Sequence, residues 1–505
     1  LWVGFLSICA SYPKANIWII PSVESPQVYR NYAQTSKVHL EMARGEVEHI
    51  QLVFPSKVNE EYRFTFDRYL KGIQISAREL KKMNGYYDAL VPFKNQLKCT
   101  DTLTAVWITV QCPSRVPVGK YHQTIKIEGS KHFTIQLDYN VHHTTIPLKS
   151  SIPITVGVEN RCMTECLNDK EADKERQRWV DFVLSYRMTP VFGTQITPER
   201  WQYEHSFSPW AWNDKRSIRL LNDRRYSCYM LPFFTLSENE LASLLCNIQK
   251  KGKLKESLFY IWDEPAYMED YEQIKRKVNI IRKYASDARI LTTFFCGPRN
   301  GPRKGDLYAV FDYLKHHIHV ATISLAPCKG NEEEVQHIRY KVPEGIDWWS
   351  YVCWQPGGNE PNFLLQMKGI QQRAIMWRTW KNGSQGFLYW NCNIYHKRNP
   401  FTYITDMPHG DGILIYPGDI LGCKGPIASA RLERWRDGAE EMELLRLVEK
   451  NYSKEKADTL LNIVYSSPLS FIEKAHNIPF FRKELLDQLD KTIPIDYKLR
   501  ITDFI

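Results

Sequence analysis

The pattern of hydrophobic and polar positions changes once along the chain, near residue 150. Between residues 16 and about 148, short apolar or alternating runs recur, such as Glu48–Phe54, Thr104–Val110 and Phe133–Val141, with turn residues between them. Short strands at such spacing are typical of a β-sandwich. The pattern therefore predicts an N-terminal β-sandwich domain over residues 16–148.

From residue 153 to about 426, apolar runs of strand length alternate with helical patterns. Leu258–Trp262 and Trp348–Cys353 have the pattern of strands, and Tyr267–Ala285 and Phe363–Trp380 that of helices. This alternation predicts a parallel α/β fold. No glycine-rich phosphate loop follows these strands, which favours a (β/α)8 TIM-like barrel over a nucleotide-binding fold. We expect this barrel over residues 153–426.

Apolar residues recur at helical spacing after residue 426, which predicts a C-terminal helical segment, residues 427–505, packed on the barrel. At the other end, the apolar run LWVGFLSICA is followed by the polar SYPKAN. This resembles the end of a signal peptide, so we interpret residues 1–15 as its remnant and expect a secretory route, extracellular or lysosomal. The alternative is a buried first strand. No stretch approaches the ~20 apolar residues that a transmembrane helix needs.

Composition narrows the functional classes. The 505 residues are 43% hydrophobic and 25% charged, as in ordinary globular proteins. The net charge of +10 is spread along the chain, without the basic stripe or motif that a nucleic-acid-binding protein would need. The 12 cysteines form no CxxC pair, and His316, His317 and His319 have no second ligand cluster at metal spacing. We therefore expect no metal and no cofactor.

Two adjacent carboxylates, Asp263 and Glu264, end the apolar run Phe259–Trp262. A helix start explains them equally well on local grounds, because an acidic residue before a proline is a common helix cap. The functional interpretation is glycoside cleavage, in which one carboxyl group protonates the leaving oxygen. Adjacent carboxylates suit a mechanism in which one orients the substrate's own 2-acetamido group and the other is the acid and base. Two close carboxylates also oppose double ionisation.

Tryptophan supplies a second clue. Seven of the 15 tryptophans lie between Trp262 and Trp390. Aromatic rings at strand ends suit the C–H faces of sugars, although we expect about half of these residues to be core.

Several longer stretches make the sequence recognisable. It resembles glycoside hydrolase family 123, the β-N-acetylgalactosaminidases, and the uncharacterised proteins that share its C-terminal catalytic barrel region. The resemblance covers nearly the whole chain in the expected order. Its motifs are ARGEVEHIQLV at 43–53, AVWITVQCPSRVPVGKY at 105–121, YIWDEP at 260–265, WWSYVCWQP at 348–356, PNFLLQ at 361–366, RAIMWRTWKNGSQGFLYWNCN at 373–393, GDGILIYPG at 410–418 and RLERWRDGAEEMELL at 431–445.

The resemblance implies a retaining exo-hydrolase that removes terminal β-linked N-acetylgalactosamine from a glycolipid or oligosaccharide through an oxazolinium intermediate. Asp263 would orient the acetamido group, and Glu264 would be the general acid and then the base. The expected sugar-binding residues are Trp349, Tyr389, Trp390, Asn393 and Asp411. The oligomeric state does not follow from the sequence. Two alternatives stay open: a glycosidase of different sugar specificity on the same scaffold, and a non-catalytic glycan-binding protein.

Overall fold

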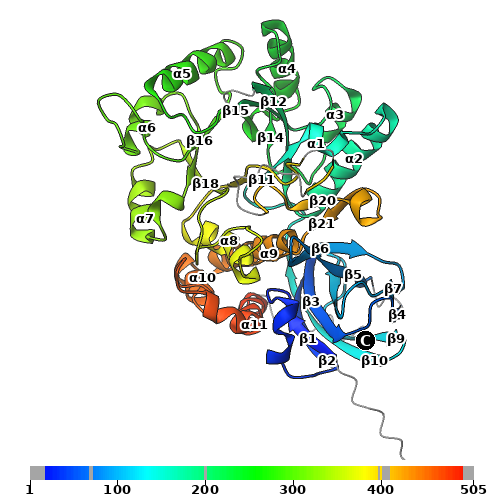
Figure 1. Ribbon diagram of the computed structural model, residues 1–505. Coiled ribbons are helices and arrows are strands. Elements are labelled where there is room, and N and C mark those ends of the chain that lie inside the picture. The colour runs from blue at the N-terminus through cyan, green and yellow to red at the C-terminus, as the bar shows by residue number, and fades with distance from the viewer. Residues whose placement is uncertain (1–16, 68–71, 198–201, 396–397, 401–409, 493–505) are drawn as a thin grey trace, which may run out of the picture.

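The computed structural model describes residues 17–67, 72–197, 202–395, 398–400 and 410–492 (Figure 1). The segment 1–15, interpreted as a signal-peptide remnant, lies outside these residues, as does the C-terminal segment beyond residue 492. Within the described chain, no helix has the length and apolarity needed to cross a membrane. The fold is a mixed α/β multidomain architecture, as the sequence predicts.

The N-terminal region consists of two five-stranded sheets that pack face to face. One has the order β1–β3–β8–β5–β6, with bounds Trp18–Pro21, Glu46–Pro55, Leu103–Cys112, Gln74–Met83 and Tyr86–Pro92. The other has the order β2–β10–β9–β4–β7, with bounds Lys37–Arg44, His132–Thr145, Gly119–Glu128, Glu61–Phe66 and Gln96–Lys98. On β9, Tyr121, Gln123, Ile125 and Ile127 are buried, while the residues that alternate with them are more open. This alternation places one face of each strand in the sandwich core.

The second region is a nine-stranded sheet of order β13–β12–β11–β19–β18–β17–β16–β15–β14. In chain order its strands are Ile154–Glu159, Thr189–Thr197, Gln202–Ser206, Tyr229–Met230, Ser257–Trp262, Ile290–Phe294, Val320–Ser324, Asp347–Val352 and Phe387–Tyr389, β11 to β19. All neighbours pair in parallel except β12 and β13, which are antiparallel.

The sheet curves into a nearly closed ring. β11 pairs with β19, so the first and last parallel strands meet. At the opposite side, β13 stands between β12 and the short β14, and the Phe207 amide donates to the Met230 carbonyl at 2.6 Å. β14 is short, because only Tyr229–Met230 of the apolar run 229–234 is paired. The ring is therefore mostly parallel, and a regular (β/α)8 barrel is not established.

Helices alternate with these strands around the ring. Their bounds are Asn160–Thr164, Asp169–Ser185, Lys215–Leu220, Glu238–Lys250, Met268–Arg282, Tyr308–Leu314, Glu332–Tyr340 and Gly369–Lys381 for α1 to α8. On α4, Leu241, Leu244 and Leu245 are buried, and Ser237 with Glu240 forms a capping box at the start. The helix predicted over 363–380 begins later, at Gly369, because the preceding segment forms an irregular loop at the edge of the ring.

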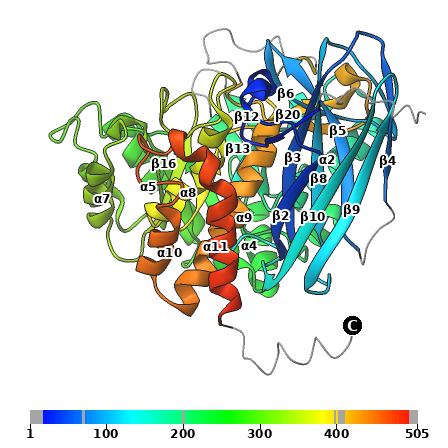
Figure 2. The ribbon, with the colours of Figure 1, turned by 90° about the horizontal axis from the view of Figure 1, so that it is seen from below.

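The C-terminal elements lie between and beside the two regions. β20 (Ile415–Pro417) and β21 (Pro426–Ala428) form a small hairpin, followed by α9 (Ala430–Asn451), α10 (Lys454–Leu461) and α11 (Ile478–Asp490). In Figure 1, α9 runs between the sandwich and the ring, and it packs against α8. Figure 2 shows α11 (red) beside β2 and β10. The predicted C-terminal helices thus contact the sandwich as well as the barrel region.

Charged side chains fill the contact between α9 and its neighbours. Arg373 of α8 binds Asp437 and Glu441, with nitrogen–oxygen distances of 3.0 and 2.6 Å. Arg482 of α11 binds Glu46 of β3 at 2.7 Å. All of these side chains are buried. Buried ions are tolerated when each has an opposite partner and further hydrogen bonds, so this network ties the sandwich to the ring in one arrangement.

Candidate active site

The inside of the ring is filled by side chains that alternate along the strands. On β18, Trp349 and Tyr351 belong to an inner cluster with Leu258 and Leu291, whereas Trp348 packs outward against the larger core. Side chains two residues apart on a strand lie on the same face. Because the carboxyl ends of parallel strands meet at one edge, Tyr351 lies one step nearer than Trp349 to the end where β15 delivers its carboxylates.

Asp263 directly follows β15, and its carboxylate is held by two hydroxyl groups. Oδ1 accepts hydrogen bonds from Tyr260 at 2.7 Å and from Thr293 at 2.6 Å. The side chain is open to solvent. Oδ2 has no hydrogen-bond partner among the residues that the structure describes. One oxygen is therefore fixed by the protein, and the other remains free for a ligand.

Glu264 has a different environment. Its backbone has a φ of 45°, in the left-handed region that non-glycine residues rarely adopt. Its N–H donates to the Thr293 hydroxyl at 3.1 Å, so Thr293 bridges both acidic residues. The Tyr351 hydroxyl donates to Glu264 Oε1. Strain of this kind persists where surrounding contacts hold it, and here those contacts come from β16 and β18.

The two carboxyl groups also differ in electrostatics. Partial burial and the charge of Asp263 raise the pKa of Glu264 to about 7, against the hydrogen bond from Tyr351 and the positive charge of Arg299, which lower that pKa. A carboxyl group with such a pKa holds a proton through mildly acidic pH and can release it near neutrality. This is the behaviour that an acid and base catalyst requires.

An aromatic wall stands behind Asp263. The His205 ring of β13 stacks on Tyr260 with ring centroids 4.2 Å apart and an interplanar angle of 9°. Burial lowers the pKa of His205 to about 3, so the ring is neutral at physiological pH. The Asp263 carboxylate contributes to raising the pKa of Tyr203 to about 12, after burial and Glu159, so Tyr203 lies near the same site. β13, the antiparallel strand added to the ring, therefore contacts the edge at which Asp263 and Glu264 lie.

Asp411 forms a third acidic position. Its Oδ1 accepts hydrogen bonds from Trp390 Nε1 at 3.0 Å and from the Tyr389 hydroxyl at 3.1 Å. Its Oδ2 is buried and has no hydrogen-bond partner among the residues that the structure describes. Burial raises the pKa of Asp411 to about 6. Burial raises the pKa of the Cys353 thiol, and the charges of Asp411, Glu264 and Asp263 add to that rise, so the thiol is within electrostatic range of all three acidic residues.

The predicted sugar-binding residues separate into two groups. Trp390 is half-buried, and its indole nitrogen donates a hydrogen bond to Asp411. Trp349 is only 1% exposed and lies inside the ring below Tyr351, so its ring is not presented to a ligand. Tyr389 and Asn393 are fully buried. Tyr389 supports Asp411, and its hydroxyl also accepts from the Gly412 amide at 2.9 Å.

Asn393 holds the end of the first strand of the ring. Its Oδ1 accepts from the Glu159 amide at 2.8 Å, and its Nδ2 donates to the Glu159 carbonyl at 3.2 Å. The Glu159 side chain is buried, its Oε2 has no partner within the described part of the chain, and burial raises its pKa to about 7. Asn393 therefore acts on the backbone, and the acidic side chain that it positions was not found from the sequence.

Sequence reasoning also missed Tyr351, Thr293 and His205 as site residues. Tyr351 lies inside the quoted motif WWSYVCWQP, but nothing local shows that its hydroxyl reaches Glu264. Trp354, in the same motif, is 43% exposed just beyond the end of β18. It is the tryptophan of this motif whose ring is available to a ligand. Its position after the last paired residue was the available signal.

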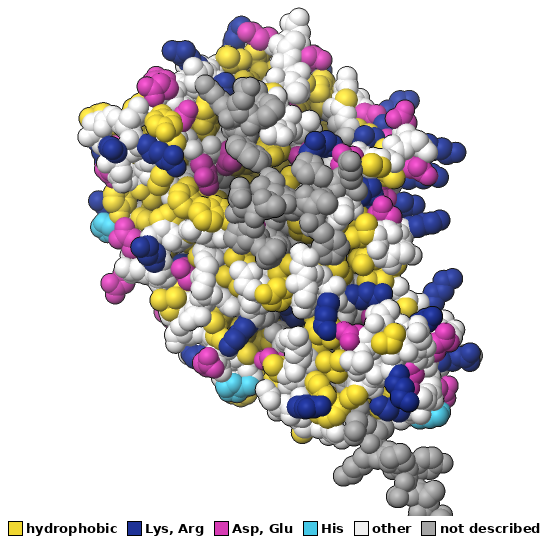
Figure 3. Space-filling model, in the orientation of Figure 1, with side chains coloured by type: hydrophobic (Ala, Val, Ile, Leu, Met, Phe, Trp, Pro, Cys, Tyr) yellow, Lys and Arg dark blue, Asp and Glu magenta, His cyan; other side chains and the backbone are white. Residues whose placement is uncertain are grey.

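The surroundings of the site carry both signs of charge. Figure 3 shows acidic and basic side chains interspersed over this face of the molecule. Within the described ranges, no three or more His, Cys, Asp or Glu side chains are grouped in a way that would hold a metal ion. The arrangement supplies one oriented carboxylate, one carboxyl group that titrates near neutrality, and nearby indole and phenol groups. Such a set can transfer a proton and hold a polar ligand.

Comparisons with known proteins agree with this chemistry. The family model "Glycoside hydrolase 123, catalytic domain" matches residues 174–448. A family 123 glycoside hydrolase from Clostridium perfringens, studied for the details of glycolipid glycan hydrolysis, superposes with a TM-score of 0.64 and 14% sequence identity, over 97% of this chain and 100% of that chain. At this identity the match shows the shared fold.

Two other solved structures are more distant. A β-D-glucuronidase from Dictyoglomus thermophilum has a TM-score of 0.33 and 10% identity, over 80% of this chain and 71% of that chain. A GH5 xyloglucanase from Bacteroides ovatus has a TM-score of 0.26 and 9% identity, over 80% of this chain and 98% of that chain. No functionally curated protein matches the chain.

Proposed function

Because this chain belongs to glycoside hydrolase family 123, we propose that it removes terminal β-linked N-acetylgalactosamine from glycans with retention of configuration. The chain is a glycoside hydrolase, and the sugar and mechanism are the proposal. The observation that carries it is the adjacent pair Asp263 and Glu264, whose two carboxyl groups have different hydrogen-bond partners. A glycolipid, the substrate class studied for the Clostridium perfringens enzyme, or an oligosaccharide would supply the glycan.

Asp263 suits the orienting role. With Oδ1 held by Tyr260 and Thr293, Oδ2 is placed to accept the N–H of the substrate's 2-acetamido group. That contact would turn the acetamido carbonyl oxygen toward the anomeric carbon. Attack by this oxygen would form the oxazolinium ion, whose positive charge the Asp263 carboxylate would stabilise.

Glu264 suits the acid and base role. It would give its proton to the glycosidic oxygen as the bond to the anomeric carbon breaks. In the second half, the ionised Glu264 would take a proton from the water that attacks the same carbon and opens the oxazolinium ring. The pKa near 7 fits both steps, since the group must be protonated first and ionised afterwards.

The remaining residues would complete the pocket. We propose that Trp390 and the exposed Trp354 line the sugar face. Asp411 is 0% exposed, so we propose that it positions Trp390 through the hydrogen bond to the indole nitrogen at 3.0 Å. We also propose that the ring is a (β/α)8 barrel modified by insertion of β13, which would place the acidic pair at its carboxyl-end face.

The test is release of nitrophenol from the nitrophenyl β-N-acetylgalactosaminide. We expect turnover by the wild type and a loss of about 10²–10⁴-fold in kcat for Glu264→Gln and Asp263→Asn. Glu269→Gln, an exposed carboxylate in the next helix, is the matched control and should keep full activity. Near-wild-type rates in both site variants would exclude this assignment.

Two further outcomes would favour the alternatives. Turnover of a galactoside that lacks the 2-acetamido group would exclude substrate assistance and indicate a different sugar specificity. Binding of the glycan without turnover over long incubation would indicate a glycan-binding protein that retains the acidic pair.

A further inference from the structure

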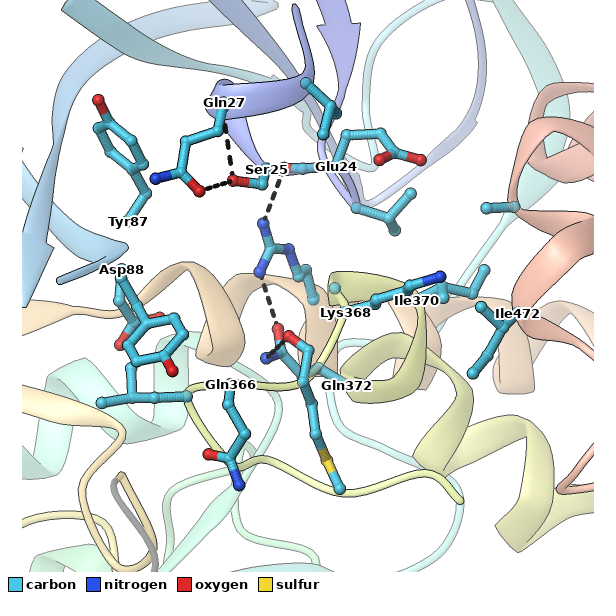
Figure 4. Close-up of a pocket in the computed structure, with 18 of the residues that line it drawn as sticks. Glu24, Ser25, Gln27, Tyr87, Asp88, Gln366, Lys368, Ile370, Gln372 and Ile472 are labelled. Carbon is cyan, nitrogen blue, oxygen red and sulfur yellow. Dashed lines mark hydrogen bonds between the residues drawn. The ribbon is translucent and has the colours of Figure 1, made fainter. Parts of the chain in front are cut away.

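A polar cavity lies where the sandwich meets the C-terminal elements, away from Asp263 and Glu264 (Figure 4). It has a volume of about 640 Å³, within the ~300–1,000 Å³ typical of ligand pockets. Its walls are the loop and short helix over residues 23–32, the start of β6, the loop over 365–370 before α8, and residues 472–476. In Figure 4, Gln27 and Gln366 approach the cavity from opposite walls.

Several polar side chains of this cavity are available to a ligand. In the described part of the chain, the side chains of Asn31, Gln366 and Lys368 make no hydrogen bond or ion pair, and all three are exposed. Tyr86, 41% exposed, adds an open aromatic ring. Amides next to an exposed aromatic ring suit the hydroxyl groups and C–H faces of sugars.

The charges in the cavity do not favour an anion. Arg434 is already occupied, because its guanidinium donates to the Ser22 carbonyl at 2.7 Å and to Gln372 Oε1 at 2.8 Å. Lys368 is opposed by the carboxylates of Glu24 and Glu473 in the same lining. A neutral ligand that is rich in hydroxyl groups fits this mixture better than a phosphate or a sulfate does.

An apolar groove adjoins this cavity. The groove has a volume of about 610 Å³ and runs between β1, β2 and the start of α11. The two share the lining residues Val23, Glu24, Tyr32, Ala475 and His476. Val38, Leu40 and Ile478 line the groove, and Phe480 stands at its edge, 55% exposed. The charged residues of its lining include Arg482 and Glu48, which are paired with each other at 2.8 Å.

We propose that the polar cavity and the apolar groove together bind an amphiphilic glycolipid, with inner sugars in the cavity and a hydrocarbon chain in the groove. The continuity of the two argues for one ligand with a polar and an apolar part. The identity of the polar part as a sugar rests on the proposed function. Figures 1 and 2 place the start of β6 and the β20–β21 hairpin near each other, so this site borders the segment that carries Asp411.

The loop before α8 lies between the cavity and the segment that carries Asp411. A side chain at Gly410 would come within 2.7 Å of Leu365, which lines the cavity. Arg431 donates to the Gly410 carbonyl at 2.7 Å and to the Phe363 carbonyl at 2.8 Å. The loop before α8 therefore contacts the cavity on one side and the Asp411 segment on the other.

The experiment is calorimetric titration of the full chain with dodecyl β-lactoside below its micelle concentration. Lactose and dodecylphosphocholine, each with only one half of that ligand, are the comparison probes. We expect dodecyl β-lactoside to bind at least about 10-fold more tightly than lactose, which burial of two methylene groups would supply. Lactosides lack the 2-acetamido group, so the titration does not depend on the catalytic pair.

Variants separate the two halves. Phe480→Ala should weaken the binding of dodecyl β-lactoside at least about 5-fold and leave the binding of lactose unchanged. The double variant Tyr86→Ala with Gln366→Ala should weaken the binding of both dodecyl β-lactoside and lactose. The matched controls Leu469→Ala, also 55% exposed, and Tyr340→Ala, 89% exposed, should change neither affinity.

Three results would overturn the proposal. They are absence of binding by dodecyl β-lactoside up to its micelle concentration, equal affinity for dodecylphosphocholine and dodecyl β-lactoside, and unchanged affinity in Phe480→Ala with a lowered unfolding temperature. The last would mean that the groove packs protein. Nitrophenyl glycoside turnover, measured on the same preparations, tests the proposed function separately. A chain that binds the lactoside but hydrolyses nothing would refute only that function.

Discussion

Tyr351 offers the sharpest test of how the pKa of Glu264, the proposed acid and base, is set. Its hydroxyl donates to Glu264 Oε1 and is the only hydrogen-bond partner of that carboxyl group among the described residues. The bond stabilises the ionised form and lowers the pKa of Glu264, against burial and the Asp263 charge, which raise it. Tyr351→Phe keeps the ring in the inner cluster and removes only the hydroxyl.

The expected shift follows from the strength of such a bond. A hydrogen bond to a charged group contributes about 1.5–3 kcal/mol, and one pKa unit corresponds to about 1.4 kcal/mol. Because Glu264 is open to solvent, water will replace part of the lost bond, so the lower end applies. We expect Tyr351→Phe to raise the pKa of Glu264 by about one unit above its value of about 7.

The sign of the rate effect is then fixed. Glu264 must be protonated to act as the acid, so activity falls as pH rises through its pKa. In Tyr351→Phe, the basic limb of kcat/KM should therefore move about one unit higher. The assay is hydrolysis of an alkyl β-N-acetylgalactosaminide between pH 5 and 9, because an alkoxide leaving group needs the proton more than nitrophenolate does.

A control and a refuting outcome complete the design. Tyr260→Phe removes a hydroxyl that binds Asp263 instead, so it should lower the rate while leaving the basic limb in place. If the limb of Tyr351→Phe stayed unmoved or shifted downward, either Glu264 would not be the acid or Tyr351 would not hold it.

Three other predictions concern Glu264 again, a buried histidine and a buried glycine. Asp263→Asn removes the charge that raises the pKa of Glu264, so carbon NMR titration of the Glu264 carboxyl should show a lower pKa than in the wild type. His142 is held by two carboxylates that raise its pKa to about 9, so it should stabilise the fold fully below pH 6.5 and lose that effect as pH rises through 9. Thermal unfolding of His142→Gln and wild type should therefore converge above that pH. Gly438→Ala would bring a Cβ within 2.2 Å of the Arg373 carbonyl, and we expect a loss of about 1–3 kcal/mol in the denaturant-derived free energy of unfolding.

The sequence was informative where one element carried the signal. Asp263 and Glu264 stand together at the end of an apolar strand, which made the pair a candidate, and the family resemblance favoured it over a simple helix start. The hydroxyls that distinguish their roles come from β16 and β18, and that pairing depends on strand order and register in the ring. A single sequence gives neither, which is why Thr293 and Tyr351 were not predicted.

Tryptophan shows the same limit in one short motif. Trp348, Trp349 and Trp354 lie within nine residues and look alike as sugar platforms. Strand alternation turns Trp348 toward the helices and Trp349 into the ring, whereas Trp354 follows the last paired residue and stays open. Nearly all positions of this apolar run are buried, so the run does not reveal which face of the strand each residue occupies. That information was needed to judge Trp349 as a sugar contact.

The helix α9 connects the sandwich to the ring. Its sequence is rich in charged residues, yet Arg431, Asp437 and Glu441 are buried because they form ion pairs with oppositely charged groups of other segments. Arg431 binds Asp88 of the sandwich at 2.9 Å and the carbonyl of Gly410 at 2.7 Å, directly before Asp411. Loss of Asp88 would leave a buried guanidinium unpaired, at a cost of about 3–5 kcal/mol. The sandwich thus supports the Asp411 segment through α9, and an isolated barrel would lack this support.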